Sequence, residues 1–123
     1  MTQLADYREE LKTVISGVTQ TQVFSSFPDK YTPPAILITP NNPYITEGET
    51  FEEHRANFQV WVIAPKGDNE VVTDFIESHL EDLIPALTTA NWSVEQVEGP
   101  YLTDVKNVQF LTVILRVSAP INF

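Results

Sequence analysis

The chain has no cysteine, few glycines and few cations: four Gly and seven Lys or Arg residues stand against 17 Asp or Glu residues. Without cysteine there can be no disulfide, no thiolate catalysis and no zinc site built on cysteine. The glycines stand alone, so no glycine-rich loop can cradle a phosphate group. The net charge of −10 argues against non-specific affinity for nucleic acid, because counterion release needs a surface of Lys and Arg.

Long apolar runs are also missing. The opening segment MTQLADYREELK lacks the apolar core of a signal peptide. No stretch approaches the roughly 20 apolar residues that a membrane-spanning helix needs. We therefore expect a soluble protein, without a membrane partner, that is made and used in a cytoplasm.

What is present is typical of a globular protein. A hydrophobic content of 42% beside a charged content of 20% makes global disorder an unlikely state for this chain. A length of 123 residues fits one domain and is long enough to bury one core. We expect residues 1–123 to form a single domain.

Two segments have the periodicity of amphipathic helices. The first covers residues 3–17, with Thr2 as a plausible N-cap. The second runs from about residue 68 to residue 88, with Asp68 as N-cap, and we expect Pro85 to end or kink it. The apolar face of this second helix is formed by Val71, Val72, Phe75, Ile76, His79, Leu80, Leu83 and Leu87.

Four segments are typical of strands. Residues 35–39 form a short apolar run, and 51–64 look extended, with a polar first half that we expect to project beyond the sheet. Residues 92–97 and 108–117 follow, and Gly99-Pro100 is expected to turn the chain between them. This order predicts an α+β fold, a mainly antiparallel sheet with two helices packed on one face.

The second predicted helix carries an acidic ridge opposite its apolar face. Like charges four residues apart each cost a helix about 0.2–0.5 kcal/mol, so local stability does not explain the ridge. It is either a solvated face that keeps the protein soluble, or a surface that binds a basic partner or repels phosphate. The acidic ridge consists of Glu70, Asp74, Glu77 and Glu81.

A second acidic segment, the arm, runs from Tyr44 to Arg55, from the connection after the first predicted strand into the polar first half of the second. Residues 43–50 are too polar and irregular to assign, and the whole segment is oversized for a simple connection. It is either a mobile acidic loop or an arm that contacts another subunit or partner. The candidate interface residues of the arm are Tyr44, Glu47, Glu49, Glu52, Glu53 and Arg55.

Residues suited to catalysis are sparse. His79 falls on an apolar helix face, where a structural histidine with a satisfied ring nitrogen is expected. His54 stands two residues after Glu52, but two ligands do not make a metal site. No carboxylate has an apolar setting that would raise its pKa, and no serine has a nucleophile signature. We predict a protein that is not an enzyme and has no catalytic residue, cofactor or metal.

Trp61 is a candidate anchor. It lies on the side of its strand opposite Val60 and Val62. It packs either against a helix in the core or at a protein interface.

Assembled in this order, the chain resembles the tail terminator proteins of long-tailed bacteriophages, also called minor tail or tail-completion proteins. The resemblance spans nearly the whole chain and is one of layout, without a short invariant motif. It lies in the size, the opening helix, the strands PPAILITP and FQVWVIAP, the helix NEVVTDFIESHLEDLIPAL, and the final pair WSVEQV and VQFLTVILRV.

The resemblance implies a structural role in the tail or neck of a virion that is assembled in the cytoplasm of a host bacterium. Such proteins form a homo-oligomeric ring, typically a hexamer, that caps the tail tube and offers a docking surface to the head. The implied partners are further copies of the chain, the tail tube protein and a head completion or connector protein. DNA would pass through the ring without specific binding, and a negative lumen suits this because it does not trap phosphates. A ring needs a heterologous interface, for which the arm against a neighbour's sheet edge is the candidate.

Three alternatives remain open. The chain could be another neck or head-tail joining protein, since several of these share small α+β folds. It could be a small acidic binding module that covers a basic protein surface, as a DNA mimic does. An enzyme of unrecognised type would require a closed cleft with converging polar groups, for example around His54.

Overall fold

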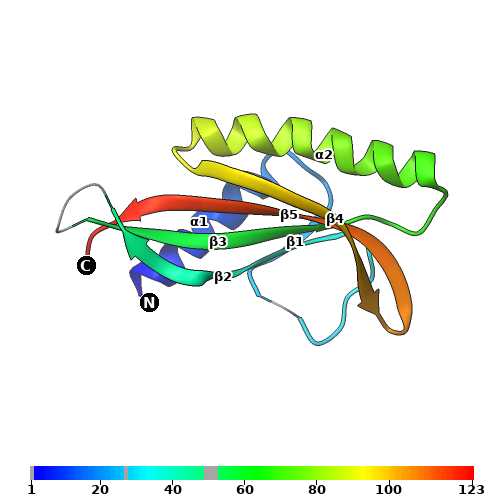
Figure 1. Cartoon of the computed structure of the whole chain (residues 1–123), viewed down its shortest axis with the longest axis horizontal. Coiled ribbons are helices and arrows are strands. Elements are labelled where there is room, and N and C mark those ends of the chain that lie inside the picture. Colours follow the sequence, from blue (N-terminus) through cyan, green and yellow to red (C-terminus); the bar gives the residue numbers. More distant parts are fainter. Residues whose placement is uncertain (1, 27, 49–52) are drawn as a thin grey trace.

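Two helices lie against one five-stranded sheet in the computed structural model, which describes residues 2–26, 28–48 and 53–123 (Figure 1). The strands have the order β1-β2-β3-β5-β4; β1 runs parallel to β2, and the other pairs are antiparallel. This is an α+β fold, as predicted. Along the chain the elements are α1 (Gln3–Ser16), β1 (Gln22–Phe24), β2 (Ala35–Glu47), β3 (His54–Ile63), α2 (Asn69–Thr89), β4 (Ser93–Val105) and β5 (Val108–Ile121).

The central strand β3 separates the two faces of the sheet. Phe58, Val60 and Val62 alternate along β3 and are fully buried on the face that the helices cover. Both helices contribute to the same core cluster, which confirms that they pack on one face of the sheet. The other buried members of the cluster include Leu11 and Ile15 of α1, Val72, Ile76, Leu83 and Leu87 of α2, Ile36 and Ile38 of β2, and Val113, Leu115 and Val117 of β5.

Both predicted helix starts are confirmed. The Ala5 N–H donates to the Thr2 hydroxyl oxygen at 3.0 Å, so Thr2 caps α1. The Val71 N–H donates to the Asp68 carboxylate at 2.9 Å, so Asp68 caps α2. In each case a short side chain satisfies a backbone donor that has no partner within the helix.

Pro85 does not end α2, so the first of the two predicted effects is wrong, and the predicted kink stays a prediction. The helix continues to Thr89, and the Ala90 N–H still donates to the Ala86 carbonyl oxygen at 3.1 Å. A proline inside a helix costs about 3 kcal/mol. Burial of Leu87 and Trp92, which are 0% and 3% exposed, offsets this cost, because each large apolar side chain contributes about 1.5–3 kcal/mol.

The apolar face of α2 is narrower than predicted. Val71 is 53% exposed and belongs to no buried cluster, so its assignment to that face is wrong. In that turn the side chain that reaches the core is Val72, and Val71 lies just outside the arc that the sheet covers. Phe75 and Leu80 are half-buried and pack against the cluster, as expected.

Gly99-Pro100 does not turn the chain, contrary to prediction. Strand β4 runs through both residues, and its register against β5 shifts between Glu98 and Tyr101. Gly99 has φ +111°, so the dipeptide forms a bulge that bends the strand. The actual turn is made by residues 106–107, which both have positive φ, as a two-residue type I′ hairpin requires.

The arm is the end of the β2–β3 hairpin. Strand β2 continues to Glu47, which pairs with His54, and His54 also pairs with Ile121 of β5. The polar start of β3 is therefore paired on both sides, so the prediction that it projects beyond the sheet is wrong for residues 54 and 55. Ladder hydrogen bonds use the backbone, so polar side chains did not prevent them. Residues 51 and 52 of the predicted strand lie outside the described residues.

We predict that Gly99→Ala destabilises the protein by about 1–3 kcal/mol, because a side chain at this φ is strained. An added Cβ would also lie 2.9 Å from the Thr112 carbonyl oxygen. Urea unfolding followed by circular dichroism measures the change. Gly17→Ala is the matched control, since Gly17 has φ −72° and its Cβ would be in ordinary contact. Equal stabilities of the two variants would contradict the bulge.

Candidate functional site

The face of the sheet that the helices leave open is mixed: it carries hydrogen-bonded polar side chains beside buried apolar ones, Leu37, Ile63 and Ile114. They come from β2, β3, β5 and β4 and alternate with the residues of the core. Four of the polar residues on the sheet are buried: Thr39, Asn57, Thr112 and Ser118. Three of them are hydrogen-bonded, whereas the Thr112 hydroxyl has no partner among the described residues. Buried polar groups are stable when they are hydrogen-bonded to one another. The partners that they already have therefore decide which of them could still bind a ligand.

Arg116 is the centre of the first set of bonds. Its Nε lies 2.5 Å from Glu98 Oε1, and its Nη2 donates to Glu98 Oε2 at 3.1 Å, so the pair is bidentate. The third nitrogen, Nη1, donates to Asn41, which also accepts from Gln59 Nε2 at 3.1 Å. One guanidinium thus connects β5 to β4 and β2, and Asn41 extends the contact to β3.

The same contact shifts both ionisation equilibria. Hydrogen bonds from Arg116 lower the pKa of Glu98 from its ordinary value of 4.5. The hydrogen bond to Glu98 in turn raises the pKa of Arg116. Each partner favours the charged form of the other, so both are ionised at neutral pH.

Arg55 is the centre of the second set. Its Nε and Nη2 donate to the Ser118 hydroxyl at 3.1 and 2.9 Å, and Nη2 also donates to the Ser93 hydroxyl at 3.1 Å. The Ser118 hydroxyl donates onward to Glu95 at 2.7 Å. Arg55, predicted as an interface residue, therefore already holds β3, β5 and β4 together within one subunit.

Trp61 lies on the face without helices, so the interpretation that it packs against a helix is wrong. The indole Nε1 donates to Thr39 Oγ1 and to Gln59 Oε1, both at 3.1 Å. The side chain is half-buried. Its expected role at a protein interface stays a prediction.

The structure does not bring the arm residues together as one surface. Tyr44 packs on the helix side, where its ring meets Phe58 edge-on at 5.6 Å, whereas Arg55 bonds on the opposite side. Glu47 is exposed and Glu53 is half-buried near the hairpin end, where the Gly48 N–H donates to the Glu53 carbonyl oxygen at 2.9 Å. The other two predicted residues of the arm, Glu49 and Glu52, lie outside the described residues.

The acidic ridge is a continuous exposed surface. All four of its carboxylates face solvent on α2, and none forms an ion pair with a residue that the structure describes. They are free to act on something outside the subunit. The ridge residues are Glu70, Asp74, Glu77 and Glu81.

The two histidines have different surroundings. His79 is half-buried, and its Nδ1 lies 2.9 Å from the Phe75 carbonyl oxygen, which fixes a proton there. Nε2 lies 3.1 and 2.9 Å from the hydroxyl oxygens of Thr19 and Thr21, so both ring nitrogens have partners and the predicted structural role of His79 is confirmed. His54 meets the Phe123 ring at 5.8 Å, and its possible metal partner Glu52 is outside the described residues. Within the described part of the chain, no group of three His, Asp or Glu side chains could hold a metal.

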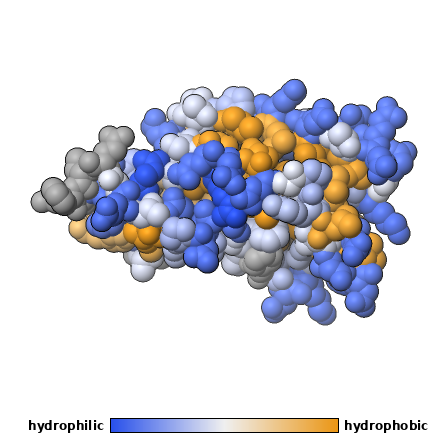
Figure 2. All heavy atoms as spheres, viewed as in Figure 1, coloured by the Kyte–Doolittle hydropathy of each residue, from blue (hydrophilic) through white to orange (hydrophobic). Residues whose placement is uncertain are grey.

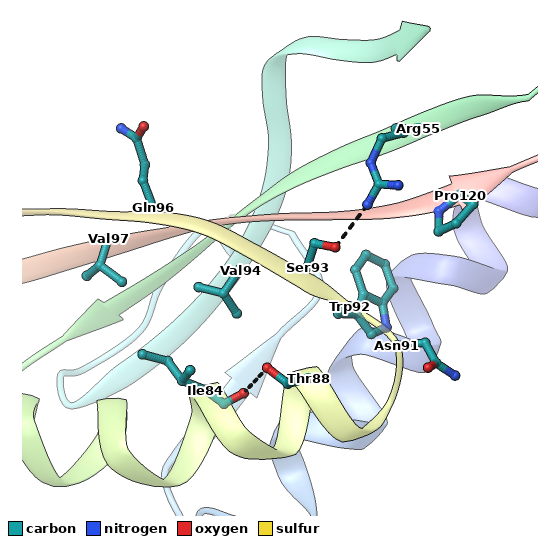
Figure 3. A pocket seen from close by; sticks show the side chains of 10 residues that line it. All are labelled: Arg55, Ile84, Thr88, Asn91, Trp92, Ser93, Val94, Gln96, Val97 and Pro120. Carbon is teal, nitrogen blue, oxygen red and sulfur yellow. Dashed lines mark hydrogen bonds between the residues drawn. The ribbon is translucent and has the colours of Figure 1, made fainter. Parts of the chain in front are cut away.

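A hollow of about 700 Å³, which the sequence analysis did not predict, lies between β4 and α2 (Figure 3). The register shift at Glu95 places Val94 and Val97 on the same side of β4, where both point toward Ile84 and Thr88 of α2. Regular alternation would have turned Val97 away. The hollow is lined by Arg55, Ile84, Thr88, Asn91, Trp92, Ser93, Val94, Gln96, Val97 and Pro120.

The lining of the hollow suits the burial of an apolar group. It includes four aliphatic or aromatic side chains and no carboxylate, in a chain with 17 acidic residues. Arg55 is its one charged residue, and Figure 3 shows that this side chain turns to Ser93. Figure 2 shows the surrounding surface, where a hydrophobic band runs below α2 toward the β4–β5 hairpin.

Comparison with protein-family models and with curated proteins finds no match for this chain. Neither of the two described helices has an apolar stretch that could span a membrane.

We predict that the stabilisation from Glu98 is lost in acid. The folded pKa of Glu98 is lowered, so its contribution is complete above the unfolded value near 4.5 and disappears as the pH falls through the folded value. The melting temperature of Glu98→Gln should lie below that of the wild type at pH 7 and approach it at pH 3. Thermal unfolding at pH 7, 5 and 3 measures this, with Glu77→Gln on the solvent face of α2 as control. A difference that does not change with pH would contradict the assignment.

Proposed function

We propose that this protein is a structural component of a virion, which caps the end of a phage tail tube as an oligomeric ring and provides the surface that joins tail to head. The observation that carries the proposal is the pairing of an exposed acidic ridge on α2 with an apolar hollow beside β4, two surfaces suited to association. The guanidinium groups of Arg55 and Arg116 are both taken up by bonds within the sheet. What remains available is an acidic exterior and an apolar hollow, which are features of association.

The acidic ridge supports passage of DNA through such a ring. Its carboxylates are exposed along one side of α2, with no cation paired to them among the described residues. At physiological ionic strength their repulsion of phosphate extends about 8 Å, so a lumen lined by α2 would keep DNA from adhering to the wall. A function of this kind would explain why the ridge is present although its like charges destabilise the helix.

The hairpin end of the arm supports contact with a second component. Strands β2 and β3 carry it to one end of the sheet, away from α2 (Figure 1). Glu47 and Glu53 place negative charge there. We propose that this end meets the tail tube protein or a head completion or connector protein through a basic surface on that partner.

A small acidic module that occupies a basic protein surface is the second candidate function. The unpaired ridge on α2 favours it, because such a surface would mimic the phosphates of DNA. Native mass spectrometry distinguishes the two. A ring, or ordered ends on tail tubes, supports the terminator, and a stable monomer that binds a basic partner supports the mimic.

We predict that this protein determines the length of tail tubes. Tube protein polymerised with it should give tubes with a density at one end and a narrow length distribution, because the ring stops further addition. Electron microscopy of tubes or virions assembled with and without the protein measures both features. Identical lengths and intact head joining in its absence would contradict the proposed function.

We also predict that Glu47→Lys with Glu53→Lys leaves folding intact and weakens attachment of the subunit to tubes or heads by at least tenfold, because like charges then face the partner. The control is Glu9→Lys with Glu10→Lys, which makes the same charge change at exposed positions of α1. Co-sedimentation with tubes measures attachment, and melting temperature confirms folding. Equal attachment of the two double variants would exclude the arm from the contact.

A further inference from the structure

The end of the β4–β5 hairpin extends beyond the rest of the sheet. The last residue of β3, Ile63, pairs with Thr112, which also pairs with Tyr101. From this row onward the hairpin of residues 101–111, with its turn at 106–107, continues as a two-stranded ribbon beside which no third described strand lies. We call these residues the ribbon. In Figure 1 it curves away from the sheet at the end opposite the β2–β3 hairpin.

The ribbon exposes apolar side chains that its own fold does not cover. Leu102 is 64% exposed, Tyr101 49% and Val108 38%. A two-stranded hairpin is only marginally stable alone. Burial of these exposed side chains against another surface would therefore stabilise the ribbon. The ribbon carries one acid, Asp104, and one base, Lys106, so it is formally neutral in a chain of net charge −10.

The hollow has the properties expected of a partner surface for the ribbon. It is concave and largely apolar, and its one charged lining residue is positive. It is formed by the first part of β4, residues 93–97, whereas the ribbon begins at Tyr101 of the same strand. At about 3.3 Å per residue, these two parts of β4 lie well separated along the strand. The ribbon therefore does not reach the hollow of its own subunit.

We propose that the ribbon of one copy docks in the hollow of the next copy, with Leu102 seated between α2 and β4. This inference rests on the proposed ring, because it supplies the two different patches that a heterologous contact requires. Charge selects a second copy as the occupant. Two subunits of charge −10 repel each other through most of their surfaces, and they repel least where a neutral ribbon enters a hollow without carboxylates. A basic partner would instead be drawn to the ridge on α2.

The first test traps the contact with cysteines, since the natural chain has none. A chain with both Leu102→Cys and Thr88→Cys is oxidised at high protein concentration and run on a denaturing, non-reducing gel. We expect a ladder of covalent multimers, whereas each single-cysteine variant gives no ladder. Dimers trapped equally well by Leu102→Cys alone would overturn the proposal, because they would mean that ribbon meets ribbon. The absence of a ladder from the double variant would overturn it as well.

The second test uses two exposed positions, so that folding is preserved. Leu102→Asp disables the ribbon and Val97→Asp disables the hollow, because each buries a charge in the contact. Each variant alone should associate at least tenfold more weakly than the wild type. A mixture should form a 1:1 dimer and stop there, since one working ribbon and one working hollow remain. Native mass spectrometry distinguishes this dimer from larger assemblies. The control is Val71→Asp, on the exposed side of α2, which should assemble normally. Rings from the mixture, or wild-type assembly by the single variants, would contradict the proposal.

Failure of this contact and failure of the proposed function give different results. Tubes that are capped while the double-cysteine variant gives no ladder would overturn the contact and leave the function standing. A ladder without any effect on tubes would overturn the function and leave the contact standing.

Discussion

The structure depends on the unequal sides of one strand, β3. Phe58, Val60 and Val62 make one side apolar and fully buried, and the residues between them are polar or amphipathic. Because β3 pairs with β2 and β5 along its length, this alternation extends across the sheet. Both helices must therefore lie on the same face, since burial of apolar surface is the main force that holds them there.

The opposite face follows from the same alternation. It carries buried polar groups, which would be costly if they were unpaired. Arg116 and Arg55 solve this by bonding across strands, to Glu98 and Asn41 in one case and to Ser118 and Ser93 in the other. These bonds join β2, β3, β5 and β4 on the same face as the buried apolar side chains of Leu37, Ile63 and Ile114. The features left for interaction are then at the edges and ends of the sheet.

Local signals in the sequence predicted the parts of the fold that depend on neighbouring residues. The capping side chains Thr2 and Asp68, the helix periodicity and the alternation of β3 act over a few positions, and each was found where expected. Gly99-Pro100 does not turn the chain and Pro85 does not end its helix, because contacts with residues distant in the sequence outweigh the local effect of these residues. Pairing with β5 kept β4 extended through the bulge, and burial of Leu87 held α2 together beyond its proline.

The candidate sites could be predicted only in part, for the same reason. The acidic ridge is visible in the sequence because helical spacing alone places its carboxylates on one side. The hollow is not, because it needs a bulge at Glu95 and the approach of two elements that are distant in the chain. The arm residues Tyr44 and Arg55 were grouped by their position in the sequence, whereas the sheet sends them to opposite faces.

The central claim is that the subunit associates through β4, at the hollow and at the ribbon, while its acidic helix stays in water. Hydrogen–deuterium exchange of the dilute subunit and of the assembled protein tests this most directly. The account predicts that the amides of residues 93–97 and 101–111 that point away from the β4–β5 ladder exchange quickly in the dilute subunit and become protected on assembly. It also predicts that exchange in the part of α2 that carries the acidic ridge, residues 70–81, changes little. Unchanged exchange along β4, with new protection confined to α2, would contradict it.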